Sequence, residues 1–472
     1  MAPTRGWAPG ARAIPPGARP ARRWTTMGLI QRTGRRVLAR LPAEVACVRA
    51  ARALACCVLA AAAASARLIQ LPPGVMEIAS PIEVTGSGVE VRGEGTVLRA
   101  AHGFRGRALV ECRGCTGALF RGFTVDGNRA ALEVRAGLAP YDVPFARFTA
   151  NNGILLDDAR EVRIEGVRFR EIAGFAVLAS RSRDITIREV AVADSGSRNS
   201  RGRNNTTGGI LLEEGTANFR VEGCRFENIR GNAVWTHSLY TSPRNRAGVI
   251  ADNRFQRIGR DAIQVGHATE VRVERNEGSE IGYPAEVVDT EGQATPVAID
   301  TAGNTDRSVY ASNRFSQING KCIDLDGFHH GEVRGNVCSD VSGYGIVMNN
   351  SNPDMRPEGV RIEGNEIRRA RYGGIFVVGS GNTIARNRLL DLNQARCDDC
   401  GYPADEPGML RSGIYLGRRA ERPAPARGNV VEANEITGYR MAARCVGRAP
   451  GIGAADNTVR GNRCRNGGPD NK

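Results

Sequence analysis

Ionisable side chains of several kinds gather in one part of the sequence, between residues 235 and 330. Four of the five histidines lie there, and so does Lys321, the only lysine before the last residue. Two aspartates follow Lys321 closely and a third precedes it. Paired carboxylates can act as general acid and base, and a Lys or His can remove a proton from a substrate. The predicted catalytic residues are Asp300, Asp324, Asp326, Lys321, His329 and His330.

Two chemistries would use these residues. Asp324 and Asp326 lie two residues apart, roughly 6.6–7 Å if both point outward from one strand. Inverting glycoside hydrolysis needs two carboxyl groups roughly 6.5–9.5 Å apart, and Asp300 would add a third carboxylate. The alternative is proton abstraction beside a uronate carboxylate by Lys321 or a histidine, leading to elimination or epimerisation. The sequence requires no cofactor, although this acidic patch would recruit Ca²⁺ on the second route.

Other polar and aromatic residues of the same region are candidates for substrate binding. Trp235 would offer a sugar-stacking surface if it points outward. The histidines keep a structural alternative, because His329 and His330 occupy a Gly-Phe-His-His-Gly turn and the other two could be ordinary surface residues. The predicted substrate-binding residues are Trp235, His237, Gln264, His267 and Asn349.

Short apolar strands recur along the chain and would position these residues. Successive copies lie 23 to 39 residues apart, and a second strand class with an Asn-containing bend lies between them. Strands of four to six residues with alternating polarity can stack into a solenoid, here with two strands per coil. The first class comprises 153–156, 176–178, 209–212, 233–235, 262–265, 298–300, 322–325, 345–348, 374–377 and 413–416.

Asparagine recurs at the bend of the second class. An Asn at a repeated bend can bond its own backbone and its counterpart one coil away, which predicts a structural ladder rather than a binding site. The ladder residues would be Asn253, Asn276, Asn313, Asn336, Asn365, Asn387, Asn434 and Asn462.

The opening coils resemble those of the pectate-lyase-like β-helix superfamily. The segments that carry the resemblance are 71–75 (LPPGV), 80–84 (SPIEV) and 120–128 (FRGFTVDGN). It implies an all-β, right-handed parallel β-helix over about residues 67–466, within one domain of residues 67–472. It does not imply a reaction, because that superfamily holds lyases, hydrolases, epimerases and proteins of no known activity. The Asp-Asp and Gly-His-Gly motifs of its pectin hydrolases are only approximated by 322–326 and 328–331, and their Arg-Ile-Lys motif and the Asp-Pro-His-Asp signature of alginate epimerases are absent.

The longest connections would flank one sheet. Loops of this length in a compact repeat are usually functional, and here they would wall a groove over the first strand class. They are Ser195–Thr207, Leu239–Arg246, Glu277–Pro296, Asn350–Glu358 and Asn393–Arg411.

Residues 1–66 have the features of a leader and secretory signal. An apolar run from Ala53 to Ala64 follows two arginines and ends in Ala64-Ser65-Ala66, a signal-peptidase pattern. The mature chain is therefore predicted to be secreted or periplasmic and free of the membrane. Removing these residues lowers the net charge from +15 to +5, and the remaining charges alternate in sign, so nucleic-acid binding is not expected.

Nine of the 12 cysteines follow the leader, in an oxidising compartment. Cys112-x-x-Cys115 and Cys397-x-x-Cys400 lack second ligand pairs at zinc spacing, so local disulfides are expected and no metal site. Cys224, Cys322 and Cys338 occupy apolar repeat positions and are expected to be small core residues.

Together these features favour an exported enzyme that binds an extended, acidic polysaccharide along a groove and cleaves or isomerises it. It would be a glycoside hydrolase, or a polysaccharide lyase or epimerase. The alternative is a non-enzymatic cell-surface or periplasmic module for glycan binding or adhesion.

Overall fold

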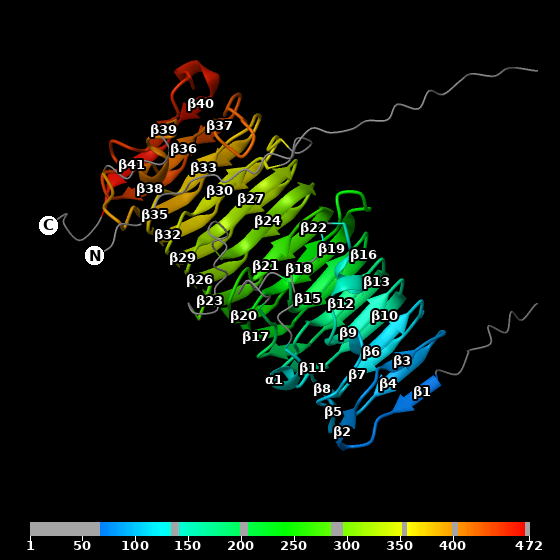
Figure 1. Cartoon of the computed structure of the whole chain (residues 1–472). Helices are drawn as coiled ribbons and strands as arrows, with labels where there is room; N and C mark the ends of the chain where they lie inside the picture. The colour runs from blue at the N-terminus through cyan, green and yellow to red at the C-terminus, as the bar shows by residue number, and fades with distance from the viewer. Residues whose placement is uncertain are drawn as a thin grey trace, which may run out of the picture. The chain divides into compact units, whose positions relative to one another are not determined.

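The computed structural model describes residues 67–133, 140, 142–198, 206–284, 296–351, 356–398 and 405–467. The predicted leader lies outside the described residues. From residue 67 the described chain forms one compact unit of stacked parallel strands, which follow one another along a single axis from β1 to β41 (Figure 1). The predicted all-β parallel solenoid is confirmed. No helix in these described ranges is long and apolar enough to cross a membrane.

Each complete coil contributes three strands, so the expectation of two strands per coil is wrong. We call the three stacks of strands the first, second and third faces. The first and second faces join into one 27-stranded sheet because β24 pairs in both, and the third face is a separate 14-stranded sheet. The corner between the first two faces is hard to see in the sequence because non-glycine residues adopt positive φ there, for example Asp158 (53°) and His267 (46°).

The first face consists of β3 (Ile82–Val84), β6 (Ala108–Arg113), β9 (Asn152–Asp157), β12 (Phe175–Ser180), β15 (Gly208–Glu213), β18 (Asn232–His237), β21 (Ile263–Val265), β24 (Val297–Asp306), β27 (Lys321–His329), β30 (Ile346–Asn349), β33 (Ile375–Val377), β36 (Ile414–Leu416) and β39 (Val446–Arg448).

The second face consists of β1 (Arg67–Gln70), β4 (Val89–Arg92), β7 (Leu119–Arg121), β10 (Arg160–Glu165), β13 (Arg183–Arg188), β16 (Ala217–Glu222), β19 (Asn245–Ala251), β22 (Ala268–Glu274), β25 (Val309–Ala311), β28 (Glu332–Arg334), β31 (Arg361–Glu363), β34 (Thr383–Ala385), β37 (Val430–Glu432) and β40 (Thr458–Arg460).

The third face consists of β2 (Gly74–Ile78), β5 (Thr96–Ala100), β8 (Thr124–Asp126), β11 (Arg168–Arg170), β14 (Ala191–Ala193), β17 (Arg225–Ile229), β20 (Arg254–Ile258), β23 (Glu277–Ile281), β26 (Arg314–Ile318), β29 (Val337–Val341), β32 (Glu366–Ala370), β35 (Arg388–Leu392), β38 (Glu435–Gly438) and β41 (Arg463–Asn466). Short helices lie between strands at α1 (Arg129–Leu132), α2 (Phe145–Phe148), η2 (Met409–Arg411) and η3 (Ala454–Asp456).

The core is a set of apolar columns inside the solenoid. Inward residues of successive first-face strands stand opposite one another, as Ile299 does with Ile323 and Ile323 with Ile346. All are almost fully buried, which confirms the predicted inward positions. Burying such a side chain contributes roughly 1.5–3 kcal/mol. The predicted inward residues are Ile154, Val177, Ile210, Val234, Ile263, Ile299, Ile323, Ile346, Ile375 and Ile414.

The predicted asparagine ladder runs along the bend between the second and third faces. Each side-chain amide donates to the Oδ1 of the next asparagine at 2.8–3.0 Å, from Asn253 to Asn462. A second, shorter ladder of Asn382, Asn429 and Asn457 precedes the second-face strands and was not predicted.

The disulfides only partly follow the sequence expectations. Cys112 bonds Cys115 as expected, and Cys397 is disulfide-bonded, although Cys400 lies outside the described residues. Cys224 is a buried free thiol, as predicted. Cys322 and Cys338 are buried as expected but bond to each other across one coil, which corrects their assignment as unpaired core residues; Cys445 bonds Cys464.

Candidate functional site

One outward column of the first face changes character along the solenoid. It begins acidic at Glu83 and Glu111, is apolar from Leu155 to Trp235, polar at Gln264, Asp300 and Asp324, and apolar again from Val347 onward. Buried apolar side chains cannot solvate a charge, so between Leu155 and Tyr415 this polar interval is where the face can bind a polar ligand. Glu111 is already bonded to the backbone N–H groups of Arg107 and Ala108 and to Arg113. In order, the register partners are Leu155, Leu178, Leu211, Trp235, Gln264, Asp300, Asp324, Val347, Phe376 and Tyr415.

The three predicted aspartates come together here, and we call them the aspartate cluster. Asp300 on β24 stands directly opposite Asp324 on β27, and Asp326 lies two residues further along β27. All three are partly exposed rather than buried in the core, as their predicted outward direction requires. Neighbouring strands lie about 4.8 Å apart and alternate residues about 6.6–7 Å apart, so one ligand can reach all three.

Each carboxylate of the cluster has a defined partner. Gln264 Nε2 donates to Asp300 Oδ2 at 2.5 Å, and the Lys321 ammonium donates to Asp324. Asp326 accepts from both the backbone N–H (2.9 Å) and the hydroxyl (2.5 Å) of Ser351. These contacts fix the orientation of the carboxylates before any substrate binds.

Burial and like charges raise the pKa of two of the aspartates. Burial raises the pKa of Asp300 well above its usual range, and the nearby carboxylates of Asp261 and Asp324 raise it further. Burial also raises the pKa of Asp326 to about 6, assisted by the charge of Asp324 and opposed by the Ser351 hydroxyl. The site therefore combines proton-retaining carboxyl groups with an ion-paired carboxylate, as acid–base catalysis requires.

Asp261 is a member of this site that the sequence analysis missed. It is almost fully buried, accepts the backbone N–H of Val297 at 2.9 Å and pairs with Arg260 at 3.3 Å. Burial raises the pKa of Asp261 to about 6. Its position directly before the apolar strand 262–265, where a polar residue is ordinary, gave no functional signal.

Trp235 is not the exposed sugar platform that the sequence predicted. It points outward from the first face, but only 9% of its surface is exposed, because an insertion between β8 and β9 covers it. Its ring lies 5.1 Å from that of Phe145 on α2. This outer apolar cluster, separate from the solenoid core, consists of Ala108, Phe145, Ala146, Leu155, Phe175, Leu178, Leu211 and Trp235.

Glu213 anchors this insertion to the first face. Its carboxylate accepts the backbone N–H groups of Phe145 and Ala146, both at 2.8 Å. Burial raises the pKa of Glu213 to about 7. The insertion therefore occupies the part of the first face that precedes the aspartate cluster, and a ligand would reach that cluster without contacting Trp235.

Replacing Trp235 by Phe should lower stability and leave the predicted glycan binding unchanged. A buried aromatic that loses part of its volume typically costs about 1 kcal/mol. Chemical denaturation would measure the free energy of unfolding, and affinity electrophoresis would measure glycan retention. Loss of retention at unchanged stability would restore the sugar-stacking role.

His237 and His267 belong to an aromatic group beside the insertion. His237 packs against Phe145 and Trp235, and His267 against Tyr240, with ring centroids 4.3–5.3 Å apart. Burial lowers the pKa of His237 to about 3 and that of His267 to about 4, so both are neutral at neutral pH. No contact recorded among the described residues joins either ring to the aspartate cluster.

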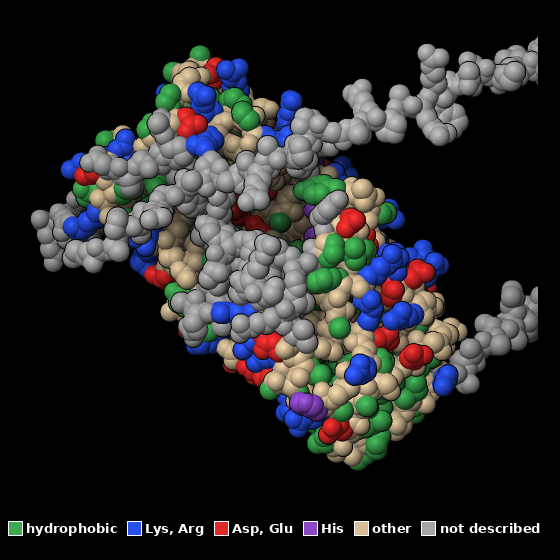
Figure 2. Space-filling model, viewed as in Figure 1, with side chains coloured by type: hydrophobic (Ala, Val, Ile, Leu, Met, Phe, Trp, Pro, Cys, Tyr) green, Lys and Arg blue, Asp and Glu red, His purple; other side chains and the backbone are tan. Residues whose placement is uncertain are grey.

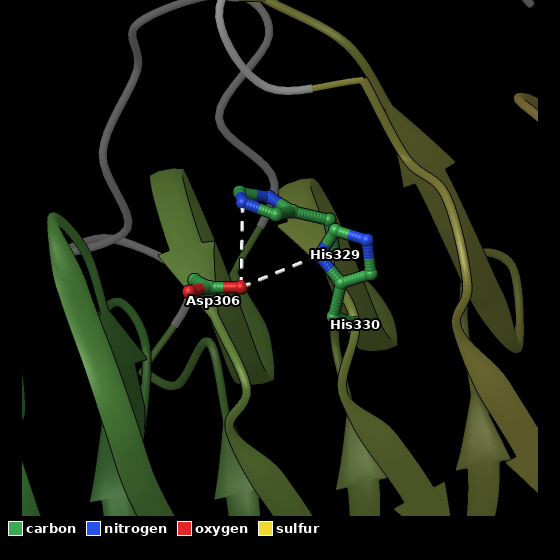
Figure 3. Close-up of side chains that lie close together, drawn as sticks. All are labelled: Asp306, His329 and His330. Atoms are coloured by element: carbon green, nitrogen blue, oxygen red, sulfur yellow. Dashed lines mark ion pairs between the residues drawn. The ribbon is translucent and has the colours of Figure 1, made fainter.

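Of the remaining predicted residues, some contact the aspartate cluster and others do not. Gln264 is buried and links Asn232 to Asp300, so it positions the carboxylate. Asn349 stands opposite Asp326, and its Oδ1 accepts the backbone N–H of Glu421 at 3.2 Å. His329 and His330 approach a different carboxylate, Asp306 at the end of β24 (Figure 3).

A recess marks the middle of the first face. Figure 2 shows acidic side chains inside it and histidine side chains at its edge. Of the predicted flanking loops, only Leu239–Arg246 is fully described; the others include residues outside the described ranges. A separate cavity lies beside the insertion, lined by residues such as Leu132, Phe148 and Thr207, and holds none of the predicted site residues.

Comparison with known proteins identifies the family. The family described as "Right handed beta helix region" matches residues 108–298 and 245–390, more than half of the chain. The chain belongs to this right-handed β-helix family. The handedness predicted from the sequence is thereby confirmed, and right-handed connection is the rule for parallel strands.

Solved structures with the same β-helix fold have distant sequences. DFA-IIIase from Arthrobacter chlorophenolicus A6, in complex with GF2, is 15% identical with a TM-score of 0.51, covering 84% of this chain and 87% of that one. The catalytic domain of a GH87 α-1,3-glucanase, in complex with tetrasaccharides, is 13% identical with a TM-score of 0.51, covering 84% of this chain and 64% of that one. No protein with a curated description matches the sequence. At these identities the similarity establishes the fold alone.

Proposed function

We propose that this β-helix protein is an exported enzyme that binds an extended, acidic polysaccharide along the first face and hydrolyses it at the aspartate cluster. The observation that carries the proposal is the polar interval of the outward column, where Asp300 stands opposite Asp324, with Asp326 two residues further along the strand of Asp324. The leader-like residues 1–66 support export to the periplasm or the medium. Among the structurally similar proteins are a glucanase with bound tetrasaccharides and a DFA-IIIase with bound GF2, which supports a sugar substrate.

The roles follow from the two chemical environments in the cluster. Burial of its carboxyl group raises the pKa of the partly exposed Asp326 to about 6, and this residue protonates the leaving oxygen. Asp324, paired with Lys321, accepts a proton from the attacking water. Their roughly 6.6–7 Å separation leaves room for that water and implies inversion at the anomeric carbon. Asp300 is a positioning residue, and the neighbouring carboxylate of Asp324 contributes to its raised pKa.

Elimination or epimerisation remains the competing chemistry. It needs a free base, but Lys321 donates to Asp324, and the buried His237 and His267 lie outside the cluster. A Ca²⁺ ion for that route would have to displace the Lys321 ammonium from Asp324. The contacts therefore favour hydrolysis.

A polysaccharide panel tests the proposal directly. Purified mature chain would be incubated with neutral and acidic polysaccharides, and both new reducing ends and the absorbance of unsaturated uronides would be recorded. Reducing ends without unsaturated products support hydrolysis, whereas unsaturated products support a lyase. Binding without turnover supports the non-enzymatic glycan-binding module. A chain that neither binds nor turns over any polysaccharide of the panel would contradict the proposal.

The proposed acid gives a definite pH dependence. Asp326 must be protonated, so kcat/KM should be high below the pKa of about 6 and fall as pH rises through it. A reaction that begins with proton abstraction by Lys or His would instead accelerate as pH rises. Initial rates between pH 4 and pH 9, taken as rough limits that bracket this pKa, distinguish the two.

A further inference from the structure

A second cluster of potential ligands lies where β24 and β27 end. Asp306 is the last residue of β24, His329 is the last residue of β27, and His330 follows it. Asp306 Oδ1 lies 3.5 Å from His329 Nε2 and 3.5 Å from His330 Nδ1. Figure 3 shows both imidazoles turned toward this one carboxylate oxygen. The three ligand atoms lie within 4.8 Å of one another.

The central oxygen of this group has no donor. Asp306 is 7% exposed, and its Oδ1 is fully buried with no hydrogen-bond partner among the described residues. An unsatisfied buried carboxylate oxygen costs roughly several kcal/mol, so such atoms usually bind an ordered water or an ion. The oxygen faces two imidazole nitrogens, which can present lone pairs to a cation.

The outer contacts resemble those that hold metal ligands in place. His329 Nδ1 lies 3.2 Å from the backbone oxygen of Gly327. Donation of the Nδ1 proton to that oxygen leaves a lone pair on Nε2, which faces Asp306. His330 presents its other nitrogen, Nε2, to Glu358 at 3.6 Å. Metal-binding histidines commonly use their second nitrogen in this way.

The distances fit a small, tetrahedral cation. Bonds of about 2.0–2.2 Å to N and O at tetrahedral angles separate neighbouring ligand atoms by about 3.3–3.6 Å. The observed oxygen–nitrogen separations of 3.5 Å lie in that range. Ca²⁺ and Mg²⁺ prefer oxygen ligands, whereas two imidazoles and one carboxylate suit Zn²⁺ and similar transition metals.

From this geometry we propose that Asp306, His329 and His330 bind one divalent transition-metal ion, with Zn²⁺ the best-fitting ion. Three protein ligands leave a fourth position for water or another oxygen ligand. The exposed His330 gives an ion access from solvent. The proposal does not depend on the polysaccharide hypothesis, and the sequence predicted no metal site because Asp306 lies 23 residues before His329.

Two arginines oppose ion binding and limit its strength. Arg307 binds the other oxygen of Asp306 at 2.5 Å, which leaves Oδ1 as the metal-facing atom. Arg244 also interacts electrostatically with Asp306 and His329. We therefore expect binding weaker than that of a structural zinc site, and Arg244→Gln should strengthen it.

Calorimetric titration of the chelator-treated full chain with ZnCl₂ tests the proposal. We expect one ion per chain and a higher thermal midpoint with Zn²⁺ present. Asp306→Asn, His329→Gln and His330→Gln should each weaken binding more than the roughly 10-fold expected for Glu358→Gln, which alters only an outer contact. His330→Gln separates loss of binding from misfolding. Half of the His330 side chain is already exposed, so its replacement should leave the fold intact.

The matched control is His102→Gln, at the one histidine remote from both clusters and exposed to solvent. It should bind Zn²⁺ as the parent chain does. Failure of the parent chain to bind Zn²⁺, binding that persists in all three ligand variants, or preferential binding of Ca²⁺ would each overturn the proposal.

Discussion

Asp324→Asn and Asp326→Asn should each lower turnover by roughly 10²-fold or more on the polysaccharide that the panel identifies. The expectation follows because each variant removes one of the two proton transfers in the proposed mechanism, and such transfers contribute about 10²–10⁴-fold. The thermal midpoint should stay nearly unchanged, since both side chains are partly exposed and lie outside the solenoid core. Steady-state rates and thermal unfolding measured on the same preparations would establish both points.

Asp158→Asn is the matched control for these variants. Asp158 is exposed at a corner of the solenoid with φ of 53°, a conformation that Asn accepts readily. Its activity should equal that of the parent chain. Full activity in both cluster variants would place the reaction elsewhere, and loss of activity together with unfolding would assign the aspartates a structural role.

Asn336→Ala should destabilise the protein by roughly 3–5 kcal/mol. The Asn336 side chain donates to the carbonyl of Tyr310 and to Asn365 Oδ1, both at 2.9 Å, and accepts two bonds from Asn313. Alanine would leave these buried groups unpaired in a site that is 1% exposed. Equilibrium denaturation in guanidinium would measure the loss.

Asn462→Ala provides the comparison within the same ladder. Asn462 is the last rung and is partly exposed; among the described residues it donates only to the carbonyl of Val431, and it accepts two bonds from Asn434. Its replacement should cost about 1 kcal/mol, because water can satisfy the freed groups. Equal losses for the two variants would show that the ladder bonds are not what stabilises the bend.

The sequence predicted the stacked framework because the framework is periodic. The inward isoleucines and valines recur from coil to coil and the asparagine bends recur from Asn253 to Asn462, so each position is supported by several others. The outward direction of Asp300 and Asp324 follows from the same alternation, since each adjoins an inward isoleucine. Their placement on one face could therefore be predicted.

The features that could not be predicted from the sequence are local and do not repeat. The insertion that buries Trp235 occurs once, between β8 and β9, and no repeat predicts where it packs. Asp306 stands opposite His329 because the pairing of β24 with β27 shifts between Ala302 and Thr305. Simple alternation along the strand therefore cannot predict which residues pair beyond the shift. The Cys322–Cys338 bond likewise joins two faces whose distance apart the sequence does not encode.

The asparagine ladder also bears on how such a protein can diversify. Consecutive rungs are separated by as few as 22 and as many as 47 residues, yet every amide bond along the ladder measures 2.8–3.0 Å. Lengthening a connection costs little loop-closure entropy, about 0.6 kcal/mol for each doubling. The surface loops can therefore vary while the stacked strands stay the same. Loops can be exchanged or grafted without changing the alignment of the strands beneath them.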